Sequence, residues 1–82
     1  MITVRFFGMV RLQTKIASIS AEANDINELL KEICNKISDV KIETLKNSVI
    51  YVNGKNIINM NLFKTKLNKN DEVQILSPIS GG

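Results

Sequence analysis

The sequence has 82 residues, with 44% hydrophobic and 23% charged side chains, which predicts a single small globular domain and excludes a disordered chain. The net charge of +3 is mild and the aromatic share is 5%, so neither a basic patch nor stacking residues support nucleic-acid binding. Histidine is absent, cysteine occurs once and there is no glycine-rich phosphate loop, which excludes the usual nucleophile–base pairs and metal sites built from histidine and cysteine.

The first third of the chain predicts a β-hairpin. Residues 2–7, ITVRFF, alternate with a period of two, which is typical of a strand, and Gly8 ends that strand. Residues 14–19, TKIASI, contain isoleucine and threonine side chains that favour a second strand. The segment 9–13 between them is expected to be the hairpin connection.

A helix is expected over residues 26–38. Asp25 lies three residues before Glu28, which resembles a capping box at the start of a helix. Cys34 falls at the edge of the apolar stripe of this helix, where a lone cysteine is most often a small core residue; a redox or persulfide role is the alternative. The stripe consists of apolar side chains at helical spacing, namely Ile26, Leu29, Leu30, Ile33 and Ile37.

The last third of the chain predicts three more strands. Residues 48–52 form a strand that leads into Asn53-Gly54, the sequence signal of a tight hairpin turn, and residues 55–58 form the return strand. A polar, asparagine-rich connection follows, and it ends in a turn at Asn70, a residue that tolerates the left-handed conformation. Residues 72–76 are the last strand.

The predicted order is β-β-α-β-β-β, which indicates an α+β fold, a mixed sheet with one main helix packed on one face. We expect one domain over residues 1–76 and a flexible tail over residues 77–82. Alternation places Phe7 and Leu76 on the face that the helix leaves open, where they are neighbours if the first and last strands pair. Such a pair can form a docking patch, but single exposed apolar residues are also normal, so the pattern leaves both interpretations open.

Three stretches of the sequence together resemble one protein family. They are FFGMVR near the start, VIYVNG in the middle and NKNDEVQILSPISGG at the end, and the resemblance spans the whole chain. The sequence is similar to the MoaD group of ubiquitin-like sulfur carriers, the small subunit of molybdopterin synthase, within the MoaD/ThiS family. The resemblance implies a β-grasp fold in which the first and last strands are adjacent, and it favours a partner-docking role for Phe7 and Leu76.

The resemblance also implies a chemistry for the tail. Gly82 is the expected reacting residue: a MoeB-like adenylyltransferase joins its carboxylate to AMP from ATP, and a persulfide sulfur donor then converts it to a thiocarboxylate. The tail, with Pro78, Ile79, Ser80 and Gly81, is expected to thread into the MoaE-like large subunit of a heterotetramer and to donate sulfur for the dithiolene of molybdopterin. The active-site residues belong to that subunit, so we expect no bound cofactor and no active site in the chain itself.

The composition of the tail suits this role. Glycine has no Cβ and adopts any φ that a narrow cleft imposes, while Pro78 limits flexibility and tends to keep Ser77 extended. The run from Ser77 to Gly82 reaches at most about 20 Å when it is fully extended, which is enough to enter the cleft of another protein.

Three positions depart from the family pattern. Ser77 replaces the first of two prolines, which predicts a looser tail; Asn70 stands for glycine; and Gly8 stands for alanine, which we expect to be a minor change. Thiamine-pathway carriers of the ThiS group also end in Gly-Gly, but they are shorter and lack the double phenylalanine and the proline before the tail. A ubiquitin-like modifier joined to lysines through Gly82 and a β-grasp interaction module with an unreactive tail are two further possibilities.

The expected location is the cytoplasm. The sequence contains no apolar run long enough to span a bilayer and no signal peptide, so no membrane partner is expected. A single cysteine cannot form an internal disulfide, which is typical of a reducing compartment.

Overall fold

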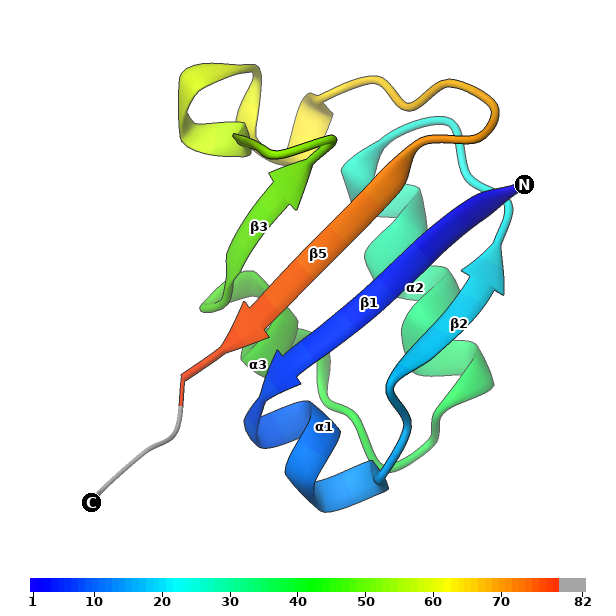
Figure 1. Ribbon diagram of the computed structural model, residues 1–82, viewed down its shortest axis with the longest axis vertical. Helices are drawn as coiled ribbons and strands as arrows, with labels where there is room; N and C mark the ends of the chain where they lie inside the picture. The colour runs from blue at the N-terminus through cyan, green and yellow to red at the C-terminus, as the bar shows by residue number, and fades with distance from the viewer. Residues whose placement is uncertain (79–82) are drawn as a thin grey trace.

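The computed structural model describes residues 1–78; residues 79–82 lie outside the described part (Figure 1). Two 3-10 turns, η1 (Ile57–Asn59) and η2 (Leu62–Lys64), lie between the last two strands. The strands and helices, in chain order, are β1 (Ile2–Gly8), α1 (Met9–Thr14), β2 (Ser18–Ala21), α2 (Ile26–Lys36), α3 (Ile42–Lys46), β3 (Val49–Val52), β4 (Lys55–Asn56) and β5 (Glu72–Ser77).

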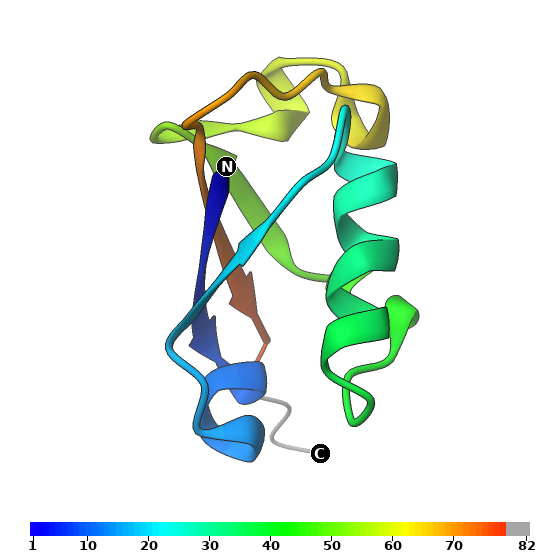
Figure 2. The same cartoon turned by 90° about the vertical axis from the view of Figure 1, so that its right-hand side faces the viewer.

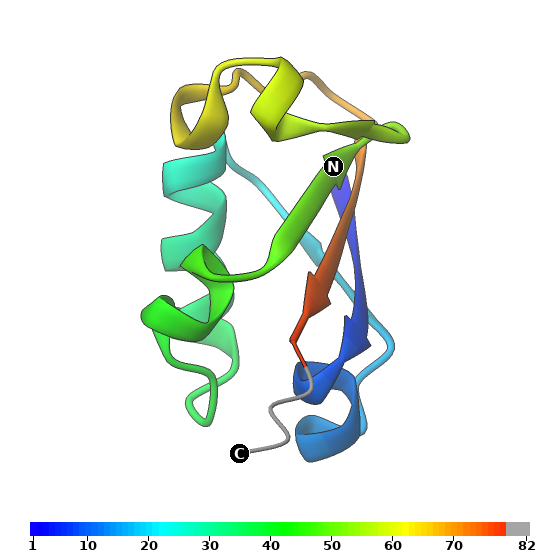
Figure 3. The same ribbon diagram turned by 90° about the vertical axis from the view of Figure 1, so that its left-hand side faces the viewer.

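The five strands form one sheet in the order β2-β1-β5-β3-β4. The central strands β1 and β5 are parallel, whereas every other pair of neighbours is antiparallel, so the sheet is mixed. Helices α2 and α3 lie on one side of the sheet, as the side views show (Figures 2 and 3), and Figure 1 looks onto the opposite face. This arrangement confirms the mixed α+β sheet that the sequence pattern predicts and the β-grasp fold that the family resemblance implies.

The hydrophobic core lies between α2 and the inward face of the sheet. Alternation along the two central strands sends every second side chain into this layer, and α2 contributes the apolar stripe of its amphipathic surface. The buried members from these three elements are Ile2, Val4, Phe6, Ile26, Leu29, Leu30, Ile33, Val73 and Ile75.

The start of α2 confirms the predicted cap. The Glu28 N–H donates to Asp25 Oδ1 over 2.8 Å, which satisfies one of the free amide groups in the first turn. Glu28 Oε1 accepts from the Asn24 N–H over 3.2 Å, one residue earlier than in the standard capping box. The helix ends at Lys36, two residues before the predicted end, and the longest helix described is therefore 11 residues. Within residues 1–78, no helix is both long and apolar enough to cross a membrane.

The predicted turns are confirmed by their backbone angles. Asn53, Gly54 and Asn70 have φ values of 51°, 85° and 67°, the left-handed values that these turns require. The Asn53 side chain also connects the β3–β4 turn to the start of β5. Its Nδ2 donates to Asp71 Oδ1, and its Oδ1 accepts from the Glu72 N–H, each over 2.9 Å.

The predicted antiparallel pairing of the first two strands is confirmed, but the segment that connects them is longer than expected and contains the helix α1. Gly8, with φ 82°, turns the chain directly from β1 into α1, and Lys15, with φ 61°, ends that helix by donating its N–H to the Arg11 carbonyl. β2 therefore begins at Ser18, four residues later than expected. The sequence contains no periodic signal for α1 because Val10 is its only buried residue.

Two other short elements differ from the prediction. Helix α3 was not predicted, because a five-residue helix with Leu45 as its one buried side chain leaves no stripe to recognise. The expected return strand 55–58 ends after Asn56, since the Asn56 side chain accepts from the Ile58 N–H over 3.0 Å and starts η1 instead.

Candidate functional site

An exposed apolar row crosses strands β1, β5 and β3 on the open face, near the end of the sheet where β5 ends. Phe7 of β1 pairs with Leu76 of β5, and Leu76 pairs on its other side with Val49 of β3. The three side chains are 37%, 45% and 40% exposed. The predicted adjacency of Phe7 and Leu76 is confirmed, while their role in docking stays a prediction. We refer to Phe7, Leu76 and Val49 as the apolar row.

Val49 is a member of the row that the sequence analysis missed. Alternation in SVIYV places Val49 and Tyr51 on the face opposite to Ile50 and Val52, so the pattern carried the signal for its orientation. The pattern did not predict that β3 lies beside β5, because strand order depends on the whole fold and not on a local stretch of sequence. The antiparallel β3–β5 pairing then brings Val49 against Leu76.

The open face becomes polar immediately beyond the row. The next set of paired residues across β1, β5 and β3 is Arg5, Gln74 and Tyr51. Arg5 Nε donates to Glu72 Oε2 over 2.7 Å, an ion pair in which both side chains remain partly exposed. The apolar character is therefore concentrated at the end of the sheet where β5 ends.

Ser77 is the last residue of β5 and is held by two hydrogen bonds. Its side chain is 1% exposed; its Oγ accepts from the Val10 N–H over 2.8 Å and donates to the Phe7 carbonyl over 3.1 Å. Ser77 itself is therefore a buried part of the sheet, while the expected looseness of the tail concerns residues that lie outside the described part of the chain. The domain boundary expected after residue 76 accordingly falls inside β5, and the strand extends one residue beyond the prediction.

Gly8 makes room for Ser77. A Cβ at Gly8 would overlap the carbonyl oxygen of Ser77, which is its register partner across β1 and β5. Its φ of 82° is also in the region that side chains disfavour. The expectation that glycine in place of alanine is a minor change at this position is therefore wrong.

The predicted tail residues divide between the described and undescribed parts of the chain. Pro78 is described and exposed, and it directly follows the buried Ser77. The predicted threading residues Ile79, Ser80 and Gly81 and the predicted reacting residue Gly82 lie outside the described residues, so their roles stay predictions.

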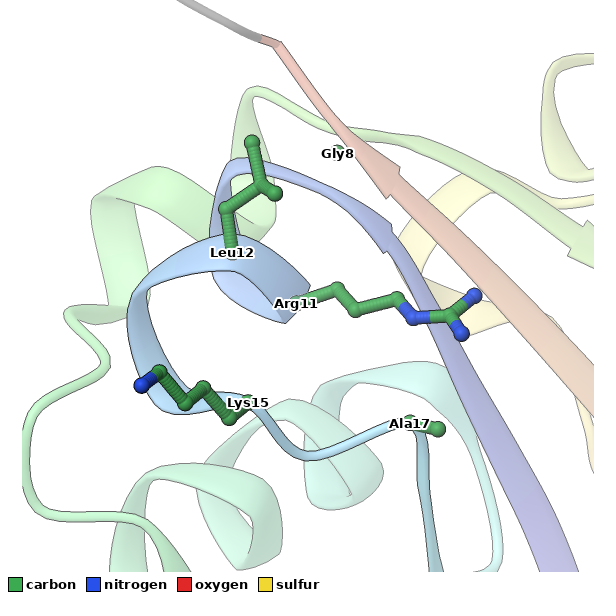
Figure 4. A pocket seen from close by; sticks show the side chains of 5 residues that line it. All are labelled: Gly8, Arg11, Leu12, Lys15 and Ala17. Atoms are coloured by element: carbon green, nitrogen blue, oxygen red, sulfur yellow. The ribbon is translucent and has the colours of Figure 1, made fainter.

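A groove of about 470 Å³ lies beside α1, next to the end of β1 (Figure 4). It is wide open, and its lining includes the side chains of Arg11, Leu12 and Lys15. In Figure 4 the Arg11 and Lys15 side chains point in opposite directions from α1. Their charges therefore do not converge on one point, as a built anion site would require.

Cys34 lies at the edge of the core and shows no sign of a reactive environment. Its side chain is half-buried and packs against the buried cluster. Burial, with a smaller contribution from the negative charge of Glu43, raises the pKa of the Cys34 thiol, which favours the unreactive protonated form. Among residues 1–78, no group of three potential metal ligands comes together.

The fold is shared with several small proteins of known structure. Small archaeal modifier protein 1 from Methanosarcina acetivorans has a TM-score of 0.84 at 22% identity, covering 99% of this chain and 95% of that one. The BexX/CysO complex of Amycolatopsis orientalis contains a chain with a TM-score of 0.77 at 22% identity, with full coverage of both chains. The complex of molybdopterin-converting factor subunits 1 and 2 from Helicobacter pylori contains a chain with a TM-score of 0.59 at 26% identity, covering 99% and 97%.

The sequence itself identifies the family. No curated protein matches the chain at a significant level. The model of the ThiS family matches residues 4–82, which include all five strands apart from the first two residues of β1. The chain therefore belongs to the ThiS family, the MoaD/ThiS ubiquitin-like sulfur carriers.

Proposed function

We propose that this protein is a sulfur carrier of the MoaD type, which acts in the cytoplasm as the small subunit of a molybdopterin synthase. The Gly82 carboxylate is ionised at neutral pH, since a terminal carboxyl has a reference pKa of about 3.3–3.7, and it is therefore a poor electrophile. A MoeB-like activating enzyme joins it to the α-phosphate of ATP, releasing pyrophosphate and leaving AMP as a good leaving group on the acyl carbon.

Sulfur then replaces AMP on Gly82. The terminal sulfur of a persulfide donor attacks the acyl carbon and AMP leaves, which forms an acyl disulfide. A thiol of the donor cleaves the S–S bond, so that Gly82 keeps the sulfur as a thiocarboxylate and the donor becomes a disulfide. In a MoaE-like large subunit the thiocarboxylate sulfur bonds to a carbon of the pterin precursor in place of an oxygen group, and water then cleaves the bond between the acyl carbon and that sulfur, which returns Gly82 to the carboxylate.

One observation carries the proposal: the apolar row lies next to the point where the chain leaves the sheet. Leu76 belongs to the row, Ser77 is anchored in β5, and Pro78 is the first exposed residue beyond it. A partner that covers the row therefore receives the residues after Pro78 at the edge of the same interface. An apolar docking surface supplies affinity that a tail alone lacks, because ordering a flexible segment costs entropy.

The MoaD assignment, as opposed to other carriers of the family, is supported by sequence features. The double phenylalanine Phe6-Phe7 and the proline before the tail, Pro78, are features of the MoaD group that thiamine-pathway carriers lack. The likeness to a subunit of the Helicobacter pylori molybdopterin-converting factor complex is consistent with such a partner. The chemical residues of the synthase reaction belong to the large subunit, because this chain has no histidine and its one thiol is held protonated.

Intact-mass measurement on protein purified from its own cell tests the proposal. We expect a fraction of the protein to carry a C-terminal peptide in which one oxygen is replaced by sulfur. Incubation with ATP and the activating enzyme should first give the acyl adenylate on the same peptide. Protein that never carries AMP or sulfur on Gly82, in the presence of each enzyme, contradicts the proposal.

A second candidate is a ubiquitin-like modifier, which the likeness to small archaeal modifier protein 1 favours. Both functions begin with the same adenylate on Gly82 and differ in the acceptor, which is sulfur in a carrier and a lysine amine in a modifier. Conjugates that carry Gly82 on the lysines of other proteins support the modifier. Transfer of sulfur to the pterin acceptor without conjugates supports the carrier, and failure to support thiamine synthesis separates the MoaD role from the ThiS role.

A further inference from the structure

The N-terminus of α1 is capped by a residue from the opposite end of the chain. The residue before the helix is Gly8, which has no side chain to accept from the free N–H groups of the first turn. Ser77, at the end of β5, accepts from the Val10 N–H instead, and the same hydroxyl donates to the Phe7 carbonyl at the end of β1. The Ser77 side chain therefore connects three elements: β5, β1 and α1.

Gly8 and Ser77 depend on one another. The carbonyl of Ser77 occupies the space that a side chain at position 8 would need, so this position cannot carry a capping residue of its own. Because Gly8 has no side chain to cap the helix, the Val10 N–H donates its hydrogen bond to the Ser77 hydroxyl. The pair Gly8–Ser77 is also the last pair in the register of β1 and β5.

Because Pro78 follows Ser77, the orientation of Ser77 determines the direction in which the chain leaves β5. The ring of Pro78 fixes its own φ near −65° and restricts the residue before it to extended conformations. The path of the chain at Pro78 is therefore set by how Ser77 is held. A small rotation at Ser77 therefore changes the direction in which Pro78 leads away from β5.

We propose that Ser77 is a positioning residue for the loading of Gly82: its hydroxyl, through Val10 and Phe7, fixes the direction in which the tail leaves the fold. This inference rests on the proposed function as a carrier. With the hydroxyl in place, a larger fraction of molecules present the tail toward the cleft of a partner that covers the apolar row. Once the tail has entered the cleft, the partner holds it, so the hydroxyl affects entry and not the chemical step.

The test uses the full-length protein and the purified activating enzyme, with ATP–pyrophosphate exchange measured as a function of carrier concentration. Ser77→Ala removes both hydrogen bonds and should raise the half-saturating carrier concentration about 5- to 10-fold, because a smaller competent fraction weakens the apparent affinity in proportion. The maximal rate should change less than about twofold. Ser77→Thr keeps the hydroxyl and should restore the wild-type half-saturating concentration.

The matched control is Thr65→Val. Thr65 is the other buried polar side chain within residues 1–78, and its hydroxyl accepts from the Asn61 N–H near η2. The substitution removes a buried hydroxyl without affecting β5 and should lower thermal stability but leave the half-saturating concentration unchanged. Ser77→Cys serves as a second variant should Ser77→Ala fail to fold, since a thiol of similar size donates and accepts only weakly.

Amide hydrogen exchange gives a readout that is independent of any partner. In Ser77→Ala, the Val10 N–H should exchange faster, while core amides of β1 such as that of Val4 should keep the protection that global stability gives. Wild-type protein that never becomes adenylated overturns the proposed function and this inference with it. Wild-type protein that loads normally, beside a Ser77→Ala variant with the same half-saturating concentration or with only a reduced maximal rate, overturns the inference alone.

Discussion

Gly8 and Ser77 show how single residues control the exit of the chain from the sheet. Both depart from the family pattern, and the structure places them in contact, with the carbonyl of Ser77 where a Gly8 side chain would be. The sequence presents them as two unrelated changes 69 positions apart, so neither could be interpreted correctly by itself. Their meaning depends on the parallel pairing of β1 with β5.

A comparison of two glycines with similar backbone conformations distinguishes the energetic cost of backbone strain from that of steric overlap. Gly8 and Gly54 have φ values of 82° and 85°, but only Gly8 faces an atom that a Cβ would meet. Gly54→Ala should lower the free energy of unfolding by about 1–2 kcal/mol through the left-handed conformation alone. Gly8→Ala should cost a further 1–3 kcal/mol or so, as in an overpacked core. Urea denaturation measures both, and equal losses would show that Ser77 does not crowd position 8.

At the scale of elements, hydrophobic periodicity predicted the helix that buries several side chains and missed the two helices that bury one side chain each. Helix α2 was predicted because four buried side chains and the Asp25 cap mark it in the sequence. Helices α1 and α3 each bury one side chain, Val10 and Leu45, so they leave no pattern. They form because tertiary contacts, such as the Ser77 cap on α1, stabilise segments too short to be helical alone.

The candidate site was predictable only in part for a related reason. The alternation rule assigned Phe7 and Leu76 to the open face, and their adjacency then required only that the first and last strands pair. Val49 joins the apolar row through strand order, which no local pattern contains. The anchoring of Ser77 depends on both strand pairing and α1, so no sequence pattern could predict it.

A charge in the apolar row should weaken partner binding. We expect Phe7→Asp, Val49→Asp or Leu76→Asp to reduce affinity for the activating enzyme or the large subunit by about 30-fold or more, because an unpaired carboxylate buried at an interface costs roughly 2 kcal/mol or more. Isothermal titration calorimetry measures the affinity. These side chains are already partly exposed in the free protein, so its thermal stability should change little.

Ile58→Asp is the control for this experiment. Ile58 is 70% exposed and lies in η1, away from the end of the sheet where β5 leads into the tail. The same change in charge at this position should leave partner affinity unchanged. Equal losses of partner affinity from Ile58→Asp and Leu76→Asp would show that the apolar row has no special role in docking. They would not contradict the proposed chemistry of the tail.

At the scale of the whole molecule, the residues that stabilise the fold are distinct in the sequence from the residue that we propose reacts. Within residues 1–78, the last buried residue is Ser77, and the proposed reacting residue, Gly82, follows five positions later in the sequence. Under the proposed function, the scaffold supplies a surface and an exit point, and the chemistry takes place in pockets of partner proteins.

Deletion of Gly82 tests this separation. The shortened protein should lose sulfur loading completely, because Gly81 then presents its carboxylate one residue short of the reacting position. Its melting temperature in calorimetry should equal that of the wild type, because the deletion changes no residue of the hydrophobic core described within residues 1–78. A marked fall in melting temperature would indicate a structural role for the tail, and undiminished loading would show that Gly82 is not the reacting residue.

The parallel pairing of β1 with β5 also has a consequence for biosynthesis. Thr3 pairs with Glu72 and Phe7 pairs with Leu76, so β1 cannot meet its central neighbour in the sheet until the chain has been synthesised as far as β5. Such long-range closure is a late event in folding. The apolar row and the point where the chain leaves the sheet thus form together, once β5 has paired with β1. Under the proposed function, an activating enzyme that reads this surface consumes no ATP on incomplete or misfolded copies.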